Sequence, residues 1–341
     1  MHIASVDEKG VIKVVGVGGG AVNVLNHLRK YSVPGVECIA MHSVADALRT
    51  GNAHKTFLLG KSGERTSRAS GARVDAEHAA SDLRQVLCGS QLVLLLSSFG
   101  GAVGTGASPV IARTTKALGI PTIALISMPF NWNGSTTQAI AAAGLELLSK
   151  SVDLLVVLSS DTAMDMLGNE DLNMDETVTG VNAVIAFAAA EVLKLVIATA
   201  PSQSDCSRFR STTGTAGLAL FGTATAGGFG RARIAAEQAV VCPLLERVAF
   251  AKAQHALVLI TTAPGSLTTT ESKLVMNVVR HAAPNAQCSL ATAADPSLVD
   301  QIRVTVVGVG LEREWQPEDC PPDRVAARLP DAPIPLPWDR A

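Results

Sequence analysis

The stretch Gly100-Gly-Ala-Val-Gly-Thr-Gly106 follows an apolar run and precedes a segment with helical periodicity. A second glycine-rich stretch, Gly16-Val-Gly-Gly-Gly-Ala-Val-Asn23, has the same setting near the start of the chain. Backbone N–H groups of a loop without large side chains can surround a phosphate, and the positive end of the following helix adds to the attraction. The two loops together predict a phosphate-binding site built from two strand–loop–helix units.

Apolar runs typical of buried strands alternate with helical patterns around the two loops. Continuous apolar strands that alternate with helices are typical of a parallel sheet covered on both faces, with ligands at the carboxyl ends of the strands. We therefore predict an α/β fold in which residues 1–174 form a Rossmann-like nucleotide-binding domain. The expected strands are 11–17, 36–41, 92–98, 122–127 and 153–158, and the expected helices are 23–30, 75–87, 108–118 and 138–150.

The remainder of the chain predicts a long helix, a smaller domain and a tail. Residues 175–200 have helical periodicity and few polar side chains, which indicates a central helix that is buried on most sides. The proline-rich residues 312–341 are typical of an extended tail. Residues 201–311 predict a smaller C-terminal α/β domain, with strands at 218–223, 256–262 and 303–309 and helices at 231–241 and 268–283.

Composition argues against several classes of partner. The 341 residues have a formal net charge of −2, and no run of Lys or Arg favours nucleic acid or an anionic membrane surface. The first ten residues have no apolar core, so we expect no secretory signal and a cytoplasmic protein. A membrane span over 181–200 is less favoured than a core helix, because Asn182, Glu191 and Lys194 interrupt the apolar run.

The cysteines and histidines show no pattern typical of a metal site. The six cysteines lack any C-x-x-C spacing, so we expect buried free thiols. His27, His54 and His78 do not have the spacing of metal ligands, and we expect no structural metal.

Several segments resemble the tubulin/FtsZ family, and they occur in the family's order over residues 11 to 310. The run GGAVGTGASP at Gly100–Pro109 is similar to the tubulin signature GGGTGTG, which is far more specific than a lone GxGxxG. The resemblance implies a GTP-binding domain, a central helix and a second domain that inserts acidic residues into the nucleotide pocket of the next subunit in a filament. The other matching segments are Ile12–Asn23, Pro129–Gly134, Val152–Leu155, Pro243–Leu245 and Arg303–Val307.

The resemblance places the phosphates of GTP or GDP against both glycine loops. Ala21 and Val22 stand where the family usually has glycines, so we expect their side chains to crowd the phosphates. Ala102 and Val103 replace Gly and Thr, which removes one hydroxyl donor. Phosphate binding is therefore expected to be weakened but retained. The expected contacts are Gly18, Gly19, Gly20, Asn23, Gly101, Gly104, Thr105 and Gly106.

The family's loop for the γ-phosphate corresponds to residues 66–72, which read Thr-Ser-Arg-Ala-Ser-Gly-Ala. Gly71 is the one glycine that remains in this segment, so we expect weak sensing of the γ-phosphate. Three guanidinium groups can bind phosphate in its place, or they form a solvated basic loop; they belong to Arg65, Arg68 and Arg73.

The positions that hold ribose and guanine in the family have lost their charges here. Asn133 stands for a Glu and Thr137 for an Arg beside the ribose and phosphates. The Asn-Asp pair that reads guanine corresponds to Val181 and Asn182. An Asn presents an NH₂ donor toward the donors of guanine, so we expect a large loss of base discrimination.

The segment that corresponds to the catalytic loop has lost one of its two acids. In the family an N-x-D-x-x-D segment polarises the attacking water across the subunit interface, and the corresponding residues are Gln203, Asp205 and Arg208. Asp205 remains a candidate catalytic residue, whereas the guanidinium of Arg208 cannot accept a proton. No other acid lies between residues 201 and 220.

These losses favour a divergent FtsZ-like protein, a pseudo-GTPase that forms or modulates filaments with little or no GTP hydrolysis. Its expected partners are other copies of itself or an authentic FtsZ. One alternative is a working, polymerisation-dependent GTPase of cell division, in which Arg208 acts as an arginine finger. A distant alternative is an NAD-dependent oxidoreductase, because Gly16-x-Gly-x-x-Ala21 fits the dinucleotide fingerprint; His42 and Ser43 then stand where an acid would bind the ribose.

Overall fold

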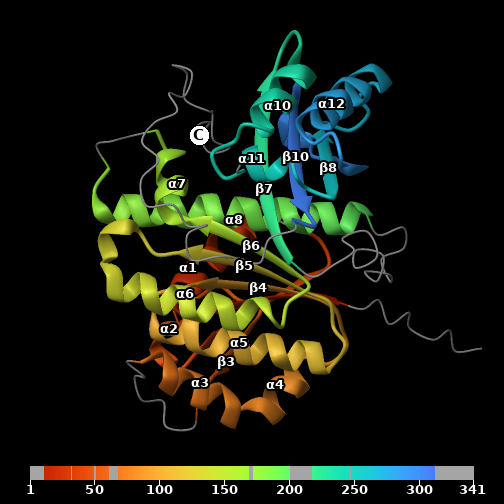
Figure 1. The fold of residues 1–341 in the computed structure, drawn as a ribbon. Helices are drawn as coiled ribbons and strands as arrows, with labels where there is room; N and C mark the ends of the chain where they lie inside the picture. Colours follow the sequence, from red (N-terminus) through yellow and green to blue (C-terminus); the bar gives the residue numbers. More distant parts are fainter. Residues whose placement is uncertain are drawn as a thin grey trace, which may run out of the picture.

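A ten-stranded sheet runs through the molecule in the computed structural model, which describes residues 11–31, 33–49, 51–60, 68–168, 172–199, 217–245 and 247–311. The strands are β1 (Val11–Val17), β2 (Val36–His42), β3 (Lys55–Leu58), β4 (Ser90–Ser98), β5 (Thr122–Met128), β6 (Leu154–Ser159), β7 (Gly217–Gly227), β8 (His255–Thr262), β9 (Gln287–Ala294) and β10 (Gln301–Val309). Their order in the sheet is β3-β2-β1-β4-β5-β6-β7-β10-β8-β9 (Figure 1).

Helices cover both faces of this sheet. The α-helices are α1 (Gly19–Leu28), α2 (Ala45–Arg49), α3 (Ala69–His78), α4 (Ala80–Leu87), α5 (Ala102–Ala117), α6 (Ser135–Ser149), α7 (Ser160–Asp165), α8 (Met174–Thr199), α10 (Arg231–Ala239), α11 (Arg247–Phe250) and α12 (Thr269–Ala282). Three short 3₁₀ helices are η1 (Arg29–Tyr31), η2 (Asn131–Asn133) and η3 (Pro296–Leu298).

Strands β1 to β6 are all parallel, as their continuous apolar sequences predict. Alternate side chains of each strand enter two different cores. One core contains Val14 and Leu94 and packs against α1 and α8, and the other contains Val15 and Leu95 and packs against α3 to α6. Parallel strands end at one edge, so the loops after β1, β4 and β5 lie together there.

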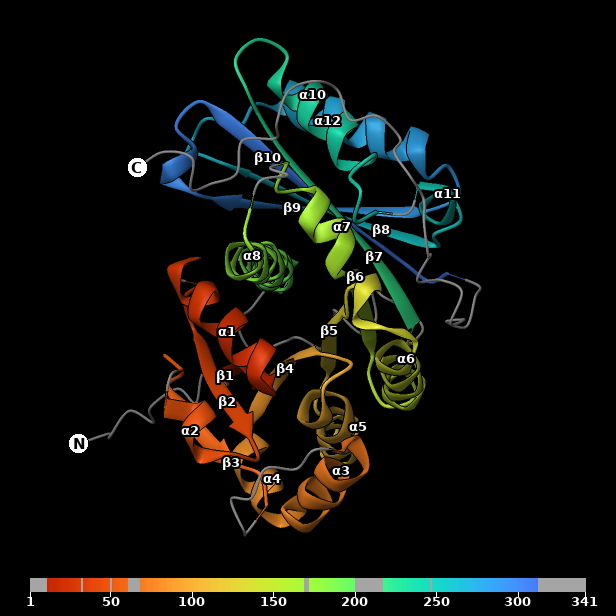
Figure 2. The same cartoon turned by 90° about the vertical axis from the view of Figure 1, so that its left-hand side faces the viewer.

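Helix α8 lies between the parallel part of the sheet and the C-terminal half, and Figure 2 shows it nearly end-on. Its buried side chains belong to the same core as α1, β1 and β4 and also touch residues of β8 and β10. It is the one helix in the described ranges that is long and apolar enough to cross a membrane, and 72% of that apolar window is buried inside the protein. The predicted central core helix is therefore confirmed.

The C-terminal half extends the same sheet with mixed pairing. The start of β7 pairs in parallel with β6, and its remaining length pairs antiparallel with β10. Strand β10 pairs antiparallel with β8, which pairs in parallel with β9. Helices α10 and α12 cover one face of these strands over a separate apolar core, while α8 covers the other face. The predicted smaller α/β unit is present.

The structure confirms every predicted strand but corrects several helix bounds. Helix α1 begins at Gly19 and α5 at Ala102, so the glycine loops are largely the first turns of the helices. The sharp changes of direction occur at Gly18 and Gly100, whose φ angles are 86° and 94°. The single helix expected over 75–87 is instead two helices, α3 and α4. The short elements α2, β3 and α7 and the largely exposed strand β9 were not predicted, because they carry little apolar pattern.

Candidate functional site

The two glycine loops are in direct contact at the carboxyl edge of the sheet. They follow β1 and β4, which are adjacent strands with Val17 opposite Ser97. A Cβ on Gly18 would lie 2.9 Å from the backbone nitrogen of Gly104, and a Cβ on Gly104 would lie 2.4 Å from the carbonyl oxygen of Ser98. Both positions therefore require glycine, and together they form a surface made of backbone.

Three helices begin at this edge without a capping side chain. Gly18, Gly101 and Gly134 are the N-cap residues of α1, α5 and α6, and none of these helices has an acid in its first turn. By contrast, α7 is capped by Ser159 and α12 by Thr268. Helices α3, α4 and α10 also lack a side-chain cap, but they do not begin at the glycine residues of this edge; α10 belongs to the C-terminal half. The free N–H groups and positive ends of three helices at one edge fit an anion such as a phosphate chain.

The expected crowding of the phosphates by Ala21 and Val22 is wrong. Both side chains are 1% exposed and belong to the apolar core beneath α1, on the side away from the open edge. Both residues are helical, and neither has a positive φ angle. Val103 is likewise buried in the core on the other face of the sheet. These substitutions leave the backbone surface of the loops free.

Thr105 and Gly106 hold the second loop in shape. The hydroxyl of Thr105 accepts a hydrogen bond from the backbone N–H of Gly100 at 2.9 Å, and the side chain is buried. A Cβ on Gly106 would lie 2.0 Å from the carbonyl oxygen of Ala69, which is the closest such approach of any glycine in the described ranges. These two residues of the signature therefore have evident packing roles.

The first loop differs in how much room surrounds each glycine. A Cβ on Gly20 would lie 2.5 Å from Oγ of Ser98, whereas the nearest atom to a Cβ on Gly19 would be Nε2 of His42 at 4.0 Å. Gly20 thus serves close packing against β4, and Gly19 faces more open space beside the carboxyl end of β2.

A cavity of about 390 Å³ lies between α1 and α8, next to the first glycine loop. Asn23 and Asn182, both predicted to contact the nucleotide, lie on its wall together. Val181, the other position aligned with the guanine pair, is instead buried in the apolar core. The complete lining consists of Asn23, Asn26, His27, Asp175, Val178, Thr179 and Asn182.

Asp175 is the one carboxylate in this lining, and it is not among the residues predicted from the sequence. It lies in the first turn of α8, where the helix dipole favours a negative charge. The sequence spacing could have indicated this residue. Asp175 precedes Asn182 by seven residues, or two helical turns, and residues at this spacing lie on the same face of a helix. Burial and the nearby Lys30 lower the pKa of His27, which favours the neutral form of this imidazole on the cavity wall.

The two positions expected beside the ribose lie around the start of α6. Asn133 is exposed on η2, and a Cβ on Gly100 would lie 2.7 Å from Cγ2 of Thr137. Phe130 and Trp132 stack with their ring centroids 4.2 Å apart. Asp161, which the sequence analysis did not name, accepts a hydrogen bond from the backbone N–H of Asn131, and its pKa is raised mainly by burial.

The segment expected to sense the γ-phosphate begins α3 beside the second loop. Arg68 is exposed at the N-cap position of that helix. Arg73 forms an exposed ion pair, with its Nε 3.1 Å from Oε1 of Glu77, which also pairs with Arg113 at 2.8 Å. Arg65 lies outside the described residues, as do Gln203, Asp205 and Arg208 of the expected catalytic segment.

The cysteines are only partly buried. Cys38 and Cys242 are buried, but Cys88 is exposed, so the expectation of buried thiols is wrong there. The imidazole of His54, just before β3, accepts a hydrogen bond from the backbone N–H of Cys38 on the neighbouring strand β2. Within the described ranges no group of three or more His, Cys, Asp and Glu is arranged to hold a metal ion.

Two family models match the chain. The GTPase domain of the tubulin/FtsZ family matches residues 11–168, and the C-terminal domain of the FtsZ family matches residues 217–312. The cell division protein FtsZ of Neisseria meningitidis is 35% identical over an alignment of 330 residues that covers 94% of this chain and 83% of that protein. This chain belongs to the tubulin/FtsZ family.

Other members of the family agree with this assignment. The cell division protein FtsZ of Azotobacter vinelandii is 34% identical over 91% of this chain and 79% of its own length. A solved FtsZ dimer of M. jannaschii is 25% identical, and the match covers 95% of both chains with a TM-score of 0.83. A GTPγS-bound CetZ2 protofilament of Haloferax volcanii shares the fold, with a TM-score of 0.76 at 18% identity over 91% of this chain and 96% of that one.

Proposed function

We propose that this member of the tubulin/FtsZ family is a filament-forming or filament-modulating subunit of the cytoplasm that binds GTP or GDP but hydrolyses GTP slowly or not at all. The site combines a backbone cradle that fits phosphates with uncharged side chains at the positions that hold ribose and guanine in the family. This combination is the observation that carries the proposal. Its partners would be further copies of the chain or a complete FtsZ.

The binding half of the proposal is supported by the geometry of the cradle. The contact between Gly18 and Gly104 leaves no space for side chains, and three uncapped helix N-termini meet at this edge. The cavity between α1 and α8 adjoins the cradle, so Asn23, Asp175 and Asn182 would contact the base of a nucleotide whose phosphates lie on the loops. The residues present therefore fit a nucleoside di- or triphosphate.

The proposed slow hydrolysis is supported by neutral residues at positions where the family resemblance implies charged ones. Asn133, Thr137 and Asn182 are neutral where the family resemblance implies charged groups. In the segment from the next subunit, Asp205 would have to orient the attacking water alone, because Arg208 cannot act as a base. We therefore infer that the chain retains binding and assembly with greatly reduced turnover.

Nucleotide content, phosphate release and light scattering of the purified full chain test this proposal. The measurements are made with GTP, GDP and no nucleotide, at protein concentrations at which an authentic FtsZ assembles in parallel. We expect bound or bindable guanine nucleotide, assembly that does not require hydrolysis, and phosphate release at least about 100-fold below the authentic protein, the scale of losing a catalytic group. Turnover comparable to the authentic FtsZ would refute the proposal.

Arg208→Asp isolates the catalytic segment. It restores the second acid of the family pattern, so phosphate release from assembled protein should rise by about 10-fold or more. Arg210→Asp is the matched control, because it makes the same charge change two residues away. An equal rise in both variants would show a general charge effect and would argue against the assigned role of position 208.

A working, polymerisation-dependent GTPase is the second candidate. It is favoured by the unobstructed glycine loops and by the carboxylate of Asp175 in the cavity. In that case Arg208 would stabilise charge on the phosphates of the neighbouring subunit, and Arg208→Asp would lower phosphate release. Membership of the tubulin/FtsZ family leaves the oxidoreductase alternative without support.

A further inference from the structure

The chain leaves β10 toward the face of the C-terminal sheet that α12 covers. Gly310 follows β10 with a φ angle of 73°, a conformation that favours glycine, and Leu311 then packs against the core shared with α10 and α12. Gln254 fixes this turn, because its backbone N–H donates to the carbonyl oxygen of Val309 and its Cβ would lie 2.8 Å from a Cβ on Gly310. Val309 lies opposite His255, the first residue of β8. The described chain therefore ends where β8 and its neighbour β9 begin.

Positive side chains line the side of α12 that lies toward the edge strand β9. Lys273 and Arg280 are seven residues apart, so they lie on the same side of the helix. Burial raises the pKa of the Cys288 thiol in β9, and the nearby charge of Arg280 opposes that rise, which places Arg280 beside β9. The other side of α12 lies toward α10, where Arg231 bonds Glu271 at 2.7 Å.

Two further basic side chains lie at the same end of the sheet. Lys252 lies in the turn before β8, and His281 lies in the last turn of α12. The dipole of α12 favours positive charge in its last turn, but it does not account for Lys252 or for Lys273 in the second turn. We name the basic surface by its four exposed side chains, which are Lys252, Lys273, Arg280 and His281.

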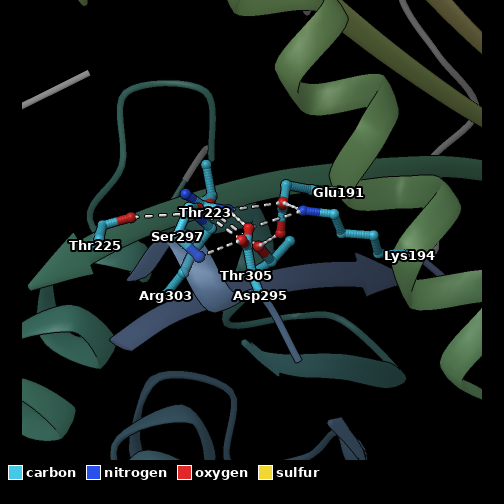
Figure 3. A network of polar contacts seen from close by, with 8 residues as sticks. All are labelled: Glu191, Lys194, Thr223, Thr225, Asp295, Ser297, Arg303 and Thr305. Carbon is cyan, nitrogen blue, oxygen red and sulfur yellow. Dashed lines mark hydrogen bonds and ion pairs between the residues drawn. The ribbon is translucent and has the colours of Figure 1, made fainter. Parts of the chain in front are cut away.

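Acids near the basic surface in the sequence are few and are engaged elsewhere. Between Glu246 and Asp295 the chain has a single acid, Glu271, which bonds on the α10 side. Asp295 lies 3.7 Å from both Lys194 and Arg303 beside α8, as Figure 3 shows. Within the part of the chain that the structure describes, none of the four residues of the basic surface forms an ion pair.

The sequence directly after Leu311 carries the complementary charge. Residues 312–323 read Glu-Arg-Glu-Trp-Gln-Pro-Glu-Asp-Cys-Pro-Pro-Asp, with five acids and one Arg. Residues 324–341 have two acids and three Arg, so the negative charge is concentrated next to the fold. Neighbouring strands are about 4.8 Å apart, and a segment of this length can span about 40 Å. It is therefore long enough to pass β8 and β9 and to reach Arg280.

We propose that the acidic residues 312–323 dock on the basic surface of the same molecule. Attachment through a short segment raises the effective concentration to about the millimolar range, so a few exposed charge pairs suffice. Such pairs are weak one by one and are screened by salt, which makes the contact reversible. The docked segment shields the basic surface from other anionic partners. The basic surface shares no residue with the glycine loops or the cavity, so the contact does not depend on nucleotide.

A photo-crosslinker in the acidic segment tests this contact. Benzoylphenylalanine takes the place of Trp315 in the full chain, and mass spectrometry of digests after irradiation locates the residues that it reaches. An equal mixture of unlabelled and nitrogen-15-labelled protein separates contacts within one molecule from contacts between two. We expect cross-links without mixed isotopes to α12, β9 or the turn before β8. Cross-links to other elements, or peptides of mixed isotopes, would overturn the proposal.

Salt and charge reversal test the electrostatic basis. The yield of these cross-links should fall by about 5-fold or more when NaCl rises from about 50 mM to about 1 M. Reversal of the three full charges of the basic surface, in Lys252→Glu with Lys273→Glu and Arg280→Glu, should lower the yield by about 10-fold or more. A yield unchanged by salt and by the reversal would show that charge does not hold the segment and would refute the contact.

A complementary reversal separates pairing from a general effect of net charge. Addition of Glu314→Lys, Glu318→Lys and Asp319→Lys to the reversed surface should restore the yield to within about 2-fold of the parent chain. Failure of this rescue in a folded protein would contradict the proposal. The matched control reverses three exposed cations in the N-terminal half and should leave the yield unchanged; it carries Lys30→Glu, Arg84→Glu and Lys116→Glu.

An anionic membrane is the rival occupant of a basic surface. Sedimentation of the parent chain with vesicles of equal parts phosphatidylglycerol and phosphatidylcholine separates the two. We expect the chain to remain in the supernatant, with the same yield of cross-links as without vesicles. Vesicle binding that abolishes the cross-links and is lost in the reversed surface would assign this surface to lipid and overturn the proposal.

Discussion

Gly18 and Gly104, from loops that follow two adjacent strands, pack backbone against backbone: a Cβ on Gly18 would lie 2.9 Å from the nitrogen of Gly104. Gly18 also has a φ angle of 86°, which side chains disfavour. Gly18→Ala therefore adds a steric clash to backbone strain, and we expect a loss of about 2 to 4 kcal/mol in the free energy of unfolding. Denaturant unfolding measures this loss, and GDP binding should fall in parallel.

Gly119→Ala separates the effect of backbone strain from that of the steric clash. Gly119 has a φ angle of 71°, but a Cβ there would meet nothing within 4 Å. This control carries the strain without the clash, so it should cost only about 1 kcal/mol and leave GDP binding unchanged. Equal losses in the two variants would mean that contact between the loops contributes nothing to stability or binding.

The sequence was sufficient to predict eight of the ten strands of the described residues, the central helix and the position of the glycine loops. Strands buried on both faces are continuous apolar runs, and the central helix is a long apolar segment, so these elements are present where expected. The bounds of α1 and α5 were wrong because glycine disfavours helices in general, whereas here the close approach of the loops selects it in the first helical turns. The glycines in these first turns are required by tertiary contacts between the loops, which a local sequence pattern does not show.

The lining of the cavity is a second feature that the sequence predicts only in part. Asn23 and Asn182 were predicted from the family resemblance, but Asp175 became visible only when α1 and α8 were seen to enclose a common space. Likewise, Ala21 and Val22 looked harmful to phosphate binding because the sequence does not show that their side chains point into the core. The direction of a side chain within a known helix was the missing information.

Asn182→Asp tests whether residue 182 contacts the guanine base of the nucleotide. A carboxylate would accept hydrogen bonds from the ring N–H and amino groups of guanine, and one charge-assisted bond is worth about 1.5 to 3 kcal/mol. We expect GDP affinity to rise by about 10- to 100-fold over the parent chain, with no rise for ADP. Competition binding with a fluorescent nucleotide measures both.

Without nucleotide, the same variant should be less stable, because Asn182 is only 7% exposed and a buried carboxylate would lack a partner. The thermal shift on adding GDP should then exceed that of the parent chain. Asn277→Asp on the exposed face of α12 makes the same charge change as a control. Improved ADP binding in Asn182→Asp would contradict contact between this residue and the base.

Asp175→Asn makes the opposite change in the same cavity. If this carboxylate accepts hydrogen bonds from guanine, its removal should lower GDP affinity by about 10-fold and lower the preference for GDP over ADP. Isothermal titration of both nucleotides measures the effect. Asp82→Asn, on the exposed side of α4, is the control and should change neither value. An unchanged preference in Asp175→Asn would place the base elsewhere.

Glu271 makes part of the stability of the C-terminal half depend on pH. A hydrogen bond from Arg231, supported by Thr268, holds the pKa of Glu271 at about 2, below its usual value of 4.5. Its contribution is therefore complete above pH 4.5 and is lost as the pH falls toward 2. Urea unfolding from pH 5 to 3 should show a loss in the free energy of unfolding that is smaller by about 1 kcal/mol in Glu271→Gln than in the parent chain, because the substituted amide does not titrate. Glu237→Gln, which removes an exposed pair with Arg233, should follow the parent curve. Parallel curves for the parent chain and Glu271→Gln would show that Glu271 does not couple folding to acid.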